Sequence, residues 1–266
     1  MNNCVRFTKG PRNMVNDIQK ASFFKRLSAF MLDSIILILV AVAVAVPISA
    51  ILSYPDTVEA FETHYKKYEE KYAIDTNMSA DEYDKLTPEQ KERYEQATKE
   101  LAKDKEIVKL YTTLMNKTIL VVTISLFFAF VVTELAIPLF FKNGQTLGKK
   151  MMSIGIMRVD SVRISSFQLF VRSIFGKFLM ETMIPILVIM LEFFGVMAGM
   201  GVIITALIFI VQIVLLIVTK TNSTIHDYFA VTVVVDMNSQ TMFDSPEALI
   251  EYKKKLHEEE VRNAPY

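Results

Sequence analysis

The sequence lacks the features on which several common classes of protein depend. Its 266 residues include one cysteine, Cys4, so a scaffold held together by disulfide bonds is excluded. Hydrophobic residues make up 52% of the chain, and this share excludes an intrinsically disordered protein. A strong net charge is also missing, because 29 acidic residues balance 29 basic residues. The informative property is therefore where the apolar and charged residues lie along the chain.

The apolar residues are concentrated in runs of about 20 residues, the length needed to cross roughly 30 Å of hydrocarbon. Strongly charged sequence separates the runs, and this distribution excludes an ordinary soluble enzyme. We predict an all-α membrane protein with four transmembrane helices. The predicted spans are residues 26–54, 118–141, 168–194 and 196–219.

The positions of Lys and Arg indicate which connections lie in the cytoplasm. Residues 1–25 and 142–167 are rich in basic residues and contain one acidic residue each. Their basic residues are Arg6, Lys9, Arg12, Lys20 and Lys25, and Lys142, Lys149, Lys150, Arg158 and Arg163. Residues 55–117 carry 15 acidic and 11 basic residues, a net charge of −4, and are predicted to be extracellular. Because the number of predicted spans is even, both termini lie on the same side, so the tail at 220–266 is predicted to be cytoplasmic like the N-terminal segment.

The insertion at 55–117 is predicted to form an antiparallel helical hairpin outside the membrane. Apolar residues recur in alternating steps of three and four, which gives a heptad-like seam broken by an aspartate. The seam consists of Val58, Phe61, Tyr65, Tyr68 and Tyr72, then Tyr94, Ala97, Leu101, Val108, Tyr111 and Met115, with Asp104 as the break. Ser79 with Glu82 and Thr87 with Gln90 stand at capping-box spacing. The hairpin is either a stalk that binds a partner or a solvated spacer whose tyrosines pack together.

A small cytoplasmic β element is predicted after the second span. Residues 152–159 alternate loosely in hydropathy and residues 162–164 return after a turn, a pattern typical of a β-hairpin. Residues 231–235 are β-branched and are predicted to add a third strand. The preceding GQTLGK stretch, residues 144–149, is not a nucleotide-binding loop, because only three residues separate its glycines and Lys150 follows where a P-loop has Ser or Thr.

Two glycines join the third and fourth spans. Gly195 and Gly199 stand at GxxxG spacing, which is used where transmembrane helices approach closely. Alternatively, they only make the turn between two consecutive helices. We favour the turn.

The predicted spans carry polar residues at similar depths. Each span has one such residue, and with a rise of 1.5 Å per residue these four side chains lie roughly 8 to 12 Å from the cytoplasmic edge of the membrane. They are Asp33, Glu134, Lys177 and Gln212, with Glu181 about one turn deeper. A charged side chain at the bilayer centre costs on the order of 2.5–3.5 kcal/mol on insertion scales, so a chance coincidence is not expected. Lys177 placed between Asp33 and Glu134 would neutralise much of this cost.

Three interpretations of these residues are open. They form a transport or ion pathway; or they are structural, with Arg26, Arg172 and Lys177 extending to the interface and Asp33 capping a helix. Catalysis is the least supported, since no nucleophile motif surrounds any serine. The histidines, His64, His226 and His257, are too scattered to be grouped as metal ligands. We therefore predict neither an enzyme nor a bound metal or cofactor.

Several of these residues together resemble the RDD family of bacterial membrane proteins, named for one Arg and two Asp residues. The residues that carry the resemblance are Arg26, Asp33, Gly144, Gln145, Thr146, Leu147, Gly148, Lys149, His226, Asp227 and the Thr232-Val233-Val234 stretch. The resemblance covers about residues 22–54 and 118–236, and GQTLGK is its most specific part. It identifies Arg26, Asp33 and Asp227 as the Arg and the two Asp of the name. The insertion and the fourth span depart from the family's compact pattern, since many members have three spans.

The resemblance implies a multi-pass protein of the bacterial cell (plasma) membrane, associated with transport but with no settled substrate. We predict a small permease or ion-coupled transporter in which Asp33, Glu134 and Lys177 form a protonatable site and Arg26 and Asp227 hold the cytoplasmic gate. The alternative is a non-transporting membrane scaffold or accessory protein that binds a partner through its external hairpin. The expected partners are the lipid bilayer and a second copy of the chain or another membrane protein, and not nucleic acid.

Overall fold

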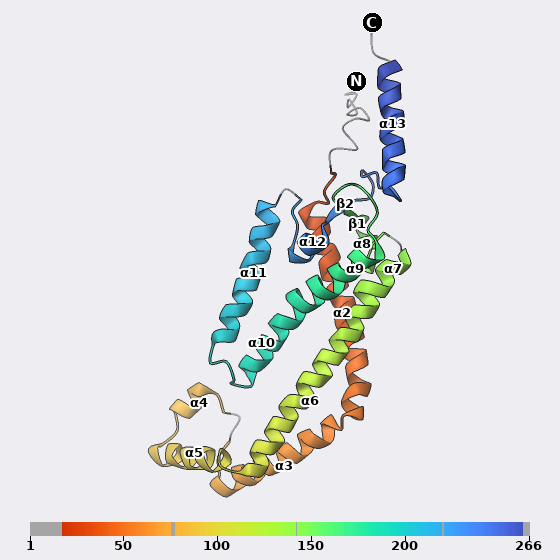
Figure 1. The fold of residues 1–266 in the computed structure, drawn as a ribbon. Coiled ribbons are helices and arrows are strands. Elements are labelled where there is room, and N and C mark those ends of the chain that lie inside the picture. Colours follow the sequence, from red (N-terminus) through yellow and green to blue (C-terminus); the bar gives the residue numbers. More distant parts are fainter. Residues whose placement is uncertain (1–17, 76–77, 142, 220, 263–266) are drawn as a thin grey trace, which may run out of the picture. The chain divides into compact units, whose positions relative to one another are not determined.

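The computed structural model describes most of the chain (Figure 1). The described residues are 18–75, 78–141, 143–219 and 221–262. The predicted cytoplasmic residues Arg6, Lys9 and Arg12, with Cys4, lie outside them, as do Lys142 and Lys220. The chain divides into two compact units. The first contains the described residues up to Ala41 and from Leu126 onwards, and the second is Val42–Ser125.

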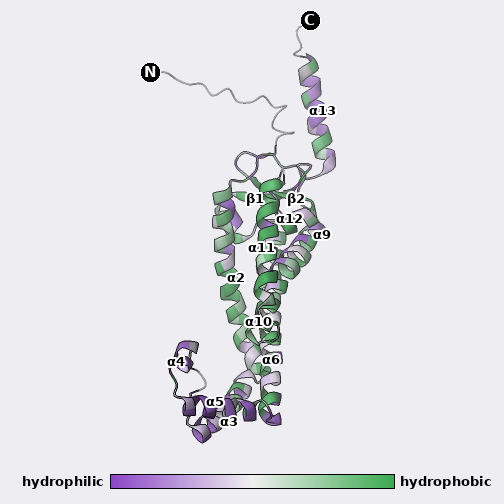
Figure 2. Ribbon diagram, turned by 90° about the vertical axis from the view of Figure 1, so that its left-hand side faces the viewer, coloured by the Kyte–Doolittle hydropathy of each residue, from purple (hydrophilic) through white to green (hydrophobic). Residues whose placement is uncertain are grey.

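Four helical stretches in the described part of the chain are long and apolar enough to cross a membrane, as predicted. They are α2 (Phe23–Ile51), Lys105–Phe141, Ser166–Phe193 and α11 (Met200–Val218). In Figure 2, α2 and α11 are coloured hydrophobic over almost their whole length, whereas the helices of the insertion are hydrophilic. The all-α membrane fold is therefore confirmed, with one small two-stranded sheet among the described residues.

The second and third spans each contain a segment of π-helix, in which the hydrogen bonds run from residue i to residue i−5. The second span consists of α6 (Lys105–Phe130), η1 (Val131–Ala136) and α7 (Ile137–Phe141). The third consists of α9 (Ser166–Phe170), η2 (Val171–Met183) and α10 (Ile184–Phe193). Each π segment is followed by a proline, Pro138 or Pro185, which has no N–H to donate and clashes with the carbonyl four residues earlier. A widened turn before each proline is one way to relieve that clash.

In the second unit, the insertion folds as the predicted antiparallel hairpin. Helix α3 (Tyr54–Tyr72) is followed by α4 (Ala80–Asp84), α5 (Pro88–Leu101) and the start of α6. The cross-hairpin contacts run in opposite directions along the two arms. They are Lys71–Glu100 at 2.7 Å, Tyr68–Asp104 at 2.6 Å and His64–Glu106 at 2.9 Å. Both predicted capping boxes, at Ser79 and Thr87, are formed.

The predicted seam is wrong at Val108. Helix α5 ends at Leu101, and α6 begins only at Lys105, because Asp104 accepts hydrogen bonds from the backbone N–H groups of Glu106 and Ile107 and caps α6. This interruption shifts the phase of the second arm. Ile107 is consequently 5% exposed and Val108 is 46% exposed.

The glycines between the third and fourth spans make the turn. Gly195 and Gly199 have φ angles of 71° and 91°, in the left-handed region that favours glycine. A Cβ atom at either position would meet nothing within 4 Å. Close helix packing therefore does not explain them, and the turn interpretation is confirmed.

The β element differs from the predicted hairpin. Strand β1 (Ile154–Arg158) pairs antiparallel with β2 (Thr232–Asp236), with Ile156 opposite Val234. The predicted return at 162–164 forms only a single bridge to β1, at Arg163, because the backbone N–H of Arg163 donates to the carbonyl of Phe243. The strand predicted as the third is thus the true partner of β1.

Three short or peripheral helices complete the first unit. They are α8 (Leu147–Met151), α12 (Ile225–Ala230) and α13 (Pro246–Arg262). The strands are buried on both faces, so they form a small core with residues from the surrounding helices and loops. Figure 1 shows β1, β2, α8 and α12 gathered beside the beginning of α2.

Candidate functional site

Glu134 and Lys177 form an ion pair between two membrane spans of the first unit. Glu134 lies in η1 and Lys177 in η2, and the Lys177 ammonium donates to Oε1 of Glu134. Glu134 is only 3% exposed. Its second oxygen, Oε2, has no hydrogen bond to any described residue. The pair therefore leaves one oxygen of a buried carboxylate available to another ligand.

The backbone around Glu134 explains its position. Pro138 cannot donate to the carbonyl of Glu134, four residues earlier, and the hydroxyl of Ser173 donates to that carbonyl at 2.6 Å. Ser173 lies one helical turn before Lys177 on η2. The contact between Ser173 and the Glu134 backbone thus brings the two oppositely charged side chains to the same level.

Asp33 fixes the GQTLGK stretch to α2. Its carboxylate accepts hydrogen bonds from the hydroxyl of Thr146 and, at 2.7 Å, from the backbone N–H of Gly148. Thr146 is in turn the N-cap of α8. A Cβ atom at Gly148 would lie 2.4 Å from the carbonyl oxygen of Ala29, so only glycine permits this approach. The contact is therefore a docking of α8 on the first span.

The other polar residues of this stretch stabilise the loop. Gln145 is buried and donates to the carbonyl of Ile154 at 2.8 Å, and it accepts a hydrogen bond from the Asn143 side chain. Gly144 has a φ angle of 66°, and a Cβ atom there would press on Ile156. Gln145 and Gly144 thus hold the loop against β1.

Lys149 is buried beside this loop. It is 9% exposed, and its ammonium makes no ion pair or hydrogen bond with a described residue. Burial lowers the pKa of Lys149 to about 8, because the nearby carboxylates of Glu134 and Asp33 only partly offset the loss of solvation and the charges of Lys177 and Arg172 add to it. An unpaired lysine of this kind can lose its proton near neutral pH.

Arg172 and Asp227 form a second buried ion pair, fully surrounded by donors. Nε and Nη2 of Arg172 donate to Oδ1 of Asp227 at 3.0 and 2.7 Å. The hydroxyl of Thr232 donates to the same oxygen, and the hydroxyl of Thr224 donates to Oδ2. Burial disfavours the charged form of Asp227, but the positive charge of Arg172 outweighs it and holds the pKa of this carboxyl well below its usual range.

Arg26 binds backbone carbonyls. Its guanidinium donates to Ala21 at 3.2 Å and to Asn222 and Val234 at 2.7 Å each. It thereby ties the start of α2 to β2 and to the segment that follows α11. This is a structural clamp between segments distant in the sequence.

Glu181 holds the start of α12. Its two oxygens accept from the backbone N–H of His226 at 2.9 Å and contact Nδ1 of His226 at 2.7 Å. A Cβ atom at Gly176 would lie 2.6 Å from Cβ of His226, which shows how closely α12 packs on η2. Gln212 of α11 accepts a long hydrogen bond, 3.5 Å, from the backbone N–H of Ile225, the first residue of α12.

The predicted set of facing polar groups is therefore divided among three contacts. Glu134 and Lys177 meet as expected, but Asp33 binds the GQTLGK loop and does not face Lys177 in an ion pair. Glu181 and Gln212 both contact the start of α12. Rotation about each helix axis decides which of these residues touch, and sequence position alone does not define that rotation.

Sequence reasoning missed two participants and misjudged a third. The pairing of His226 with Glu181 and the burial of Lys149 were not anticipated, and Arg172, expected to be solvated, is buried against Asp227. The Thr224–Asp227 spacing of a capping box was a usable signal that Asp227 begins a helix and lies inside. No signal of this kind reveals the partner of Arg172.

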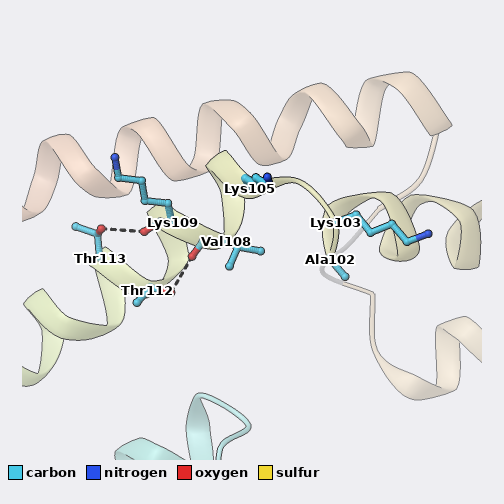
Figure 3. Close-up of a pocket in the computed structure, with 7 residues that line it drawn as sticks. All are labelled: Ala102, Lys103, Lys105, Val108, Lys109, Thr112 and Thr113. Carbon is cyan, nitrogen blue, oxygen red and sulfur yellow. Dashed lines mark hydrogen bonds between the residues drawn. The ribbon is translucent and has the colours of Figure 1, made fainter.

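A shallow depression in the second unit does not form a comparable site (Figure 3). It has a volume of about 440 Å³ and is lined in part by Lys103, Lys105 and Lys109. The hydroxyls of Thr112 and Thr113, which also line it, donate to backbone carbonyls of their own helix at 2.8 Å. No convergent set of polar groups remains there among the described residues. The buried charges of the first unit are the stronger candidate.

No group of three or more His, Cys, Asp or Glu side chains in the described ranges is placed to hold a metal ion. Comparison with known proteins found no similar curated protein and no similar solved structure. The family model described as "RDD family" matches residues 20–231, which is most of the chain and includes every charged residue of the site. Together with the four apolar helices, this places the protein in a membrane. The chain belongs to the RDD family.

Proposed function

We propose that this protein is a small ion-coupled transporter that moves a monovalent cation across the bacterial cell membrane, with Glu134 as the cation ligand. The observation that carries the proposal is the incomplete coordination of Glu134: a carboxylate buried inside a span, bound by one ammonium group and with Oε2 unoccupied by any described residue. Ionisable residues inside spans are costly and typically mark ion pathways. A cation that replaces the Lys177 ammonium would satisfy the same carboxylate.

The contrast with Asp227 supports this assignment. Asp227 receives two hydrogen bonds from Arg172 and one each from two threonine hydroxyls, so both oxygens are occupied. Such a pair fixes packing and leaves no place for a ligand. Glu134 and Lys177 instead form a pair that a competing cation can open, since lysine is a point charge on a flexible stem.

The remaining contacts suit a supporting role. Asp33 and Arg26 hold α8 and β2 against the first span, and Glu181 holds α12 against the third. By the distribution of basic residues, we place both termini and these elements in the cytoplasm and the helical insertion outside. Four spans are few for enclosing a pathway, so we propose that two or more copies associate.

The test is flux through purified protein in sealed liposomes that contain a pH-sensitive dye. Sodium, potassium or proton gradients are imposed across liposomes containing the wild type, Glu134→Gln or the control Glu192→Gln. Glu192 also lies in the third span, but its carboxylate accepts from the N–H groups of Gly199 and Gly201 at the turn. We expect flux in the wild type and Glu192→Gln and its loss in correctly inserted Glu134→Gln. Equal flux in all three proteins would refute the role of Glu134.

A scaffold function is the second candidate. It is favoured by the insertion, which has ion pairs and aromatic contacts between its own helices. In that case the external hairpin binds a partner, and substitutions at Glu134 act only through stability. Deletion of the hairpin and neutralisation of Glu134 distinguish the two candidates, because a scaffold depends on the hairpin and a transporter on the Glu134 charge.

A further inference from the structure

We propose that Lys149 is the proton-exchanging group of this site, releasing its proton when a monovalent cation binds at Glu134. The inference rests on the proposed cation site and adds the group to which cation binding is coupled. The ammonium of Lys149 gives one proton to water and becomes a neutral amine, while one cation enters. The charge of the site is the same before and after, and no electrons are transferred.

The fold holds Lys149 where such an exchange is useful. Asp33 binds Thr146 and Gly148 on α8, and the backbone N–H of Lys149 donates to the Thr146 hydroxyl at 3.4 Å. The side chain of Lys149 is thereby buried, without an ion pair or hydrogen bond from its ammonium to the described residues. The adjacent Lys150 is exposed, and its ammonium lies 3.9 Å from the centre of the Phe141 ring.

The charges around Lys149 come from three elements. Asp33 on α2 and Glu134 on η1 attract its proton, whereas Arg172 and Lys177 on η2 repel it. Asp227 neutralises Arg172 directly. While Lys149 is protonated, Lys149 and Lys177 balance the two remaining carboxylates, those of Asp33 and Glu134. An added cation then leaves one excess positive charge. The loss of one proton from Lys149 removes it.

Lys149 is the group best suited to lose that proton. The guanidinium of Arg172 is held by the Asp227 carboxylate through two hydrogen bonds. The ammonium of Lys177 donates directly to the carboxylate of Glu134. Lys149 has no such partner, and its pKa of about 8 allows both forms to be populated near neutral pH.

The experiment measures proton release and cation binding together. Protein in lipid nanodiscs is held in weak buffer at pH 8, sodium or potassium chloride is added, and a soluble pH indicator reports released protons. Choline chloride controls for ionic strength, and equilibrium binding of the radiolabelled cation is measured on the same samples. The variants are Lys149→Arg, which cannot lose its proton, Lys149→Met, which is always neutral, and the matched control Lys150→Arg.

We expect proton release on cation binding in the wild type and Lys150→Arg and none in either Lys149 variant. Lys149→Met should still bind the cation, with an affinity that no longer changes between pH 7 and 9. If the wild type binds the cation without releasing protons, or Lys149→Met releases as many as the wild type, the role of Lys149 is overturned and the cation site stands. If the wild type binds no cation, the proposed function fails and this inference fails with it.

Discussion

Asp227 and Glu134 are both buried carboxylates paired with a basic side chain, and they differ in how many donors surround them. Asp227 accepts from Arg172, Thr224 and Thr232, so loss of its charge leaves a buried guanidinium without a counter-ion. Glu134 has a single side-chain partner. The same residue type is thus structural at one position and available for binding at the other.

Replacing Asp227 should therefore act on stability. We expect Asp227→Asn to cost roughly 3–5 kcal/mol, the usual penalty for removing one partner of a buried ion pair. Asp236→Asn is the control, because Asp236 pairs with the partly exposed Lys25 and should lose no more than about 1 kcal/mol. Thermal unfolding in detergent and the amount of protein in the membrane report both effects. Equal melting temperatures for the two variants would contradict the structural role of the Arg172–Asp227 pair.

The same carboxylate predicts a dependence on acid. Its pKa is lower in the folded protein than in the unfolded chain, so the unfolded state binds protons first as the pH falls. The stabilisation by Asp227 is complete above the unfolded pKa of about 4 and is lost progressively below it. Melting temperature measured between pH 7 and 3 should fall in the wild type and fall less in Asp227→Asn. Parallel curves would show that another group dominates acid unfolding.

At the scale of elements, the docking of α8 on α2 depends on the absence of a side chain at Gly148. We expect Gly148→Ala to destabilise the first unit by about 1–3 kcal/mol and to abolish the proposed cation flux, since a Cβ atom would lie 2.4 Å from the Ala29 carbonyl oxygen. Gly155→Ala is the comparison, because its Cβ atom would meet only the side chain of Met237, which can move. Melting temperature and flux distinguish the two. A Gly148→Ala protein as stable and active as Gly155→Ala would rule out the close docking.

Local signals predicted the elements well, and the contacts between elements less well. The capping boxes at Ser79 and Thr87 form as expected, because a cap depends only on residues three positions apart. The pairing of β1 with β2 was missed, since the paired residues are 74 to 82 positions apart and the nearer segment also had strand character. Likewise, the Asp33–Thr146 contact depends on the rotation of α2, which hydropathy does not define.

At the scale of the whole chain, the buried charges lie in the first unit and the helical insertion lies in the second, and deletion of the insertion tests which of them carries the function. A transporter built around Glu134 should retain flux when residues 58–112 are replaced by a short polar linker, provided that the protein still inserts. A scaffold should lose its function in the same variant. Flux is measured in liposomes, and protease protection shows whether the same protein has entered the membrane in the correct orientation. Loss of flux in a correctly inserted deletion variant would show that the insertion is part of the transport machinery.

The central claim is that a cation and the Lys177 ammonium compete for the Glu134 carboxylate. Equilibrium binding of a radiolabelled monovalent cation to the wild type, Lys177→Met and Glu134→Gln in nanodiscs tests it most directly. Removal of the competing ammonium should tighten binding in Lys177→Met, and removal of the ligand charge should abolish binding in Glu134→Gln. Binding that is unchanged by both substitutions, or that is absent from the wild type, would contradict the account.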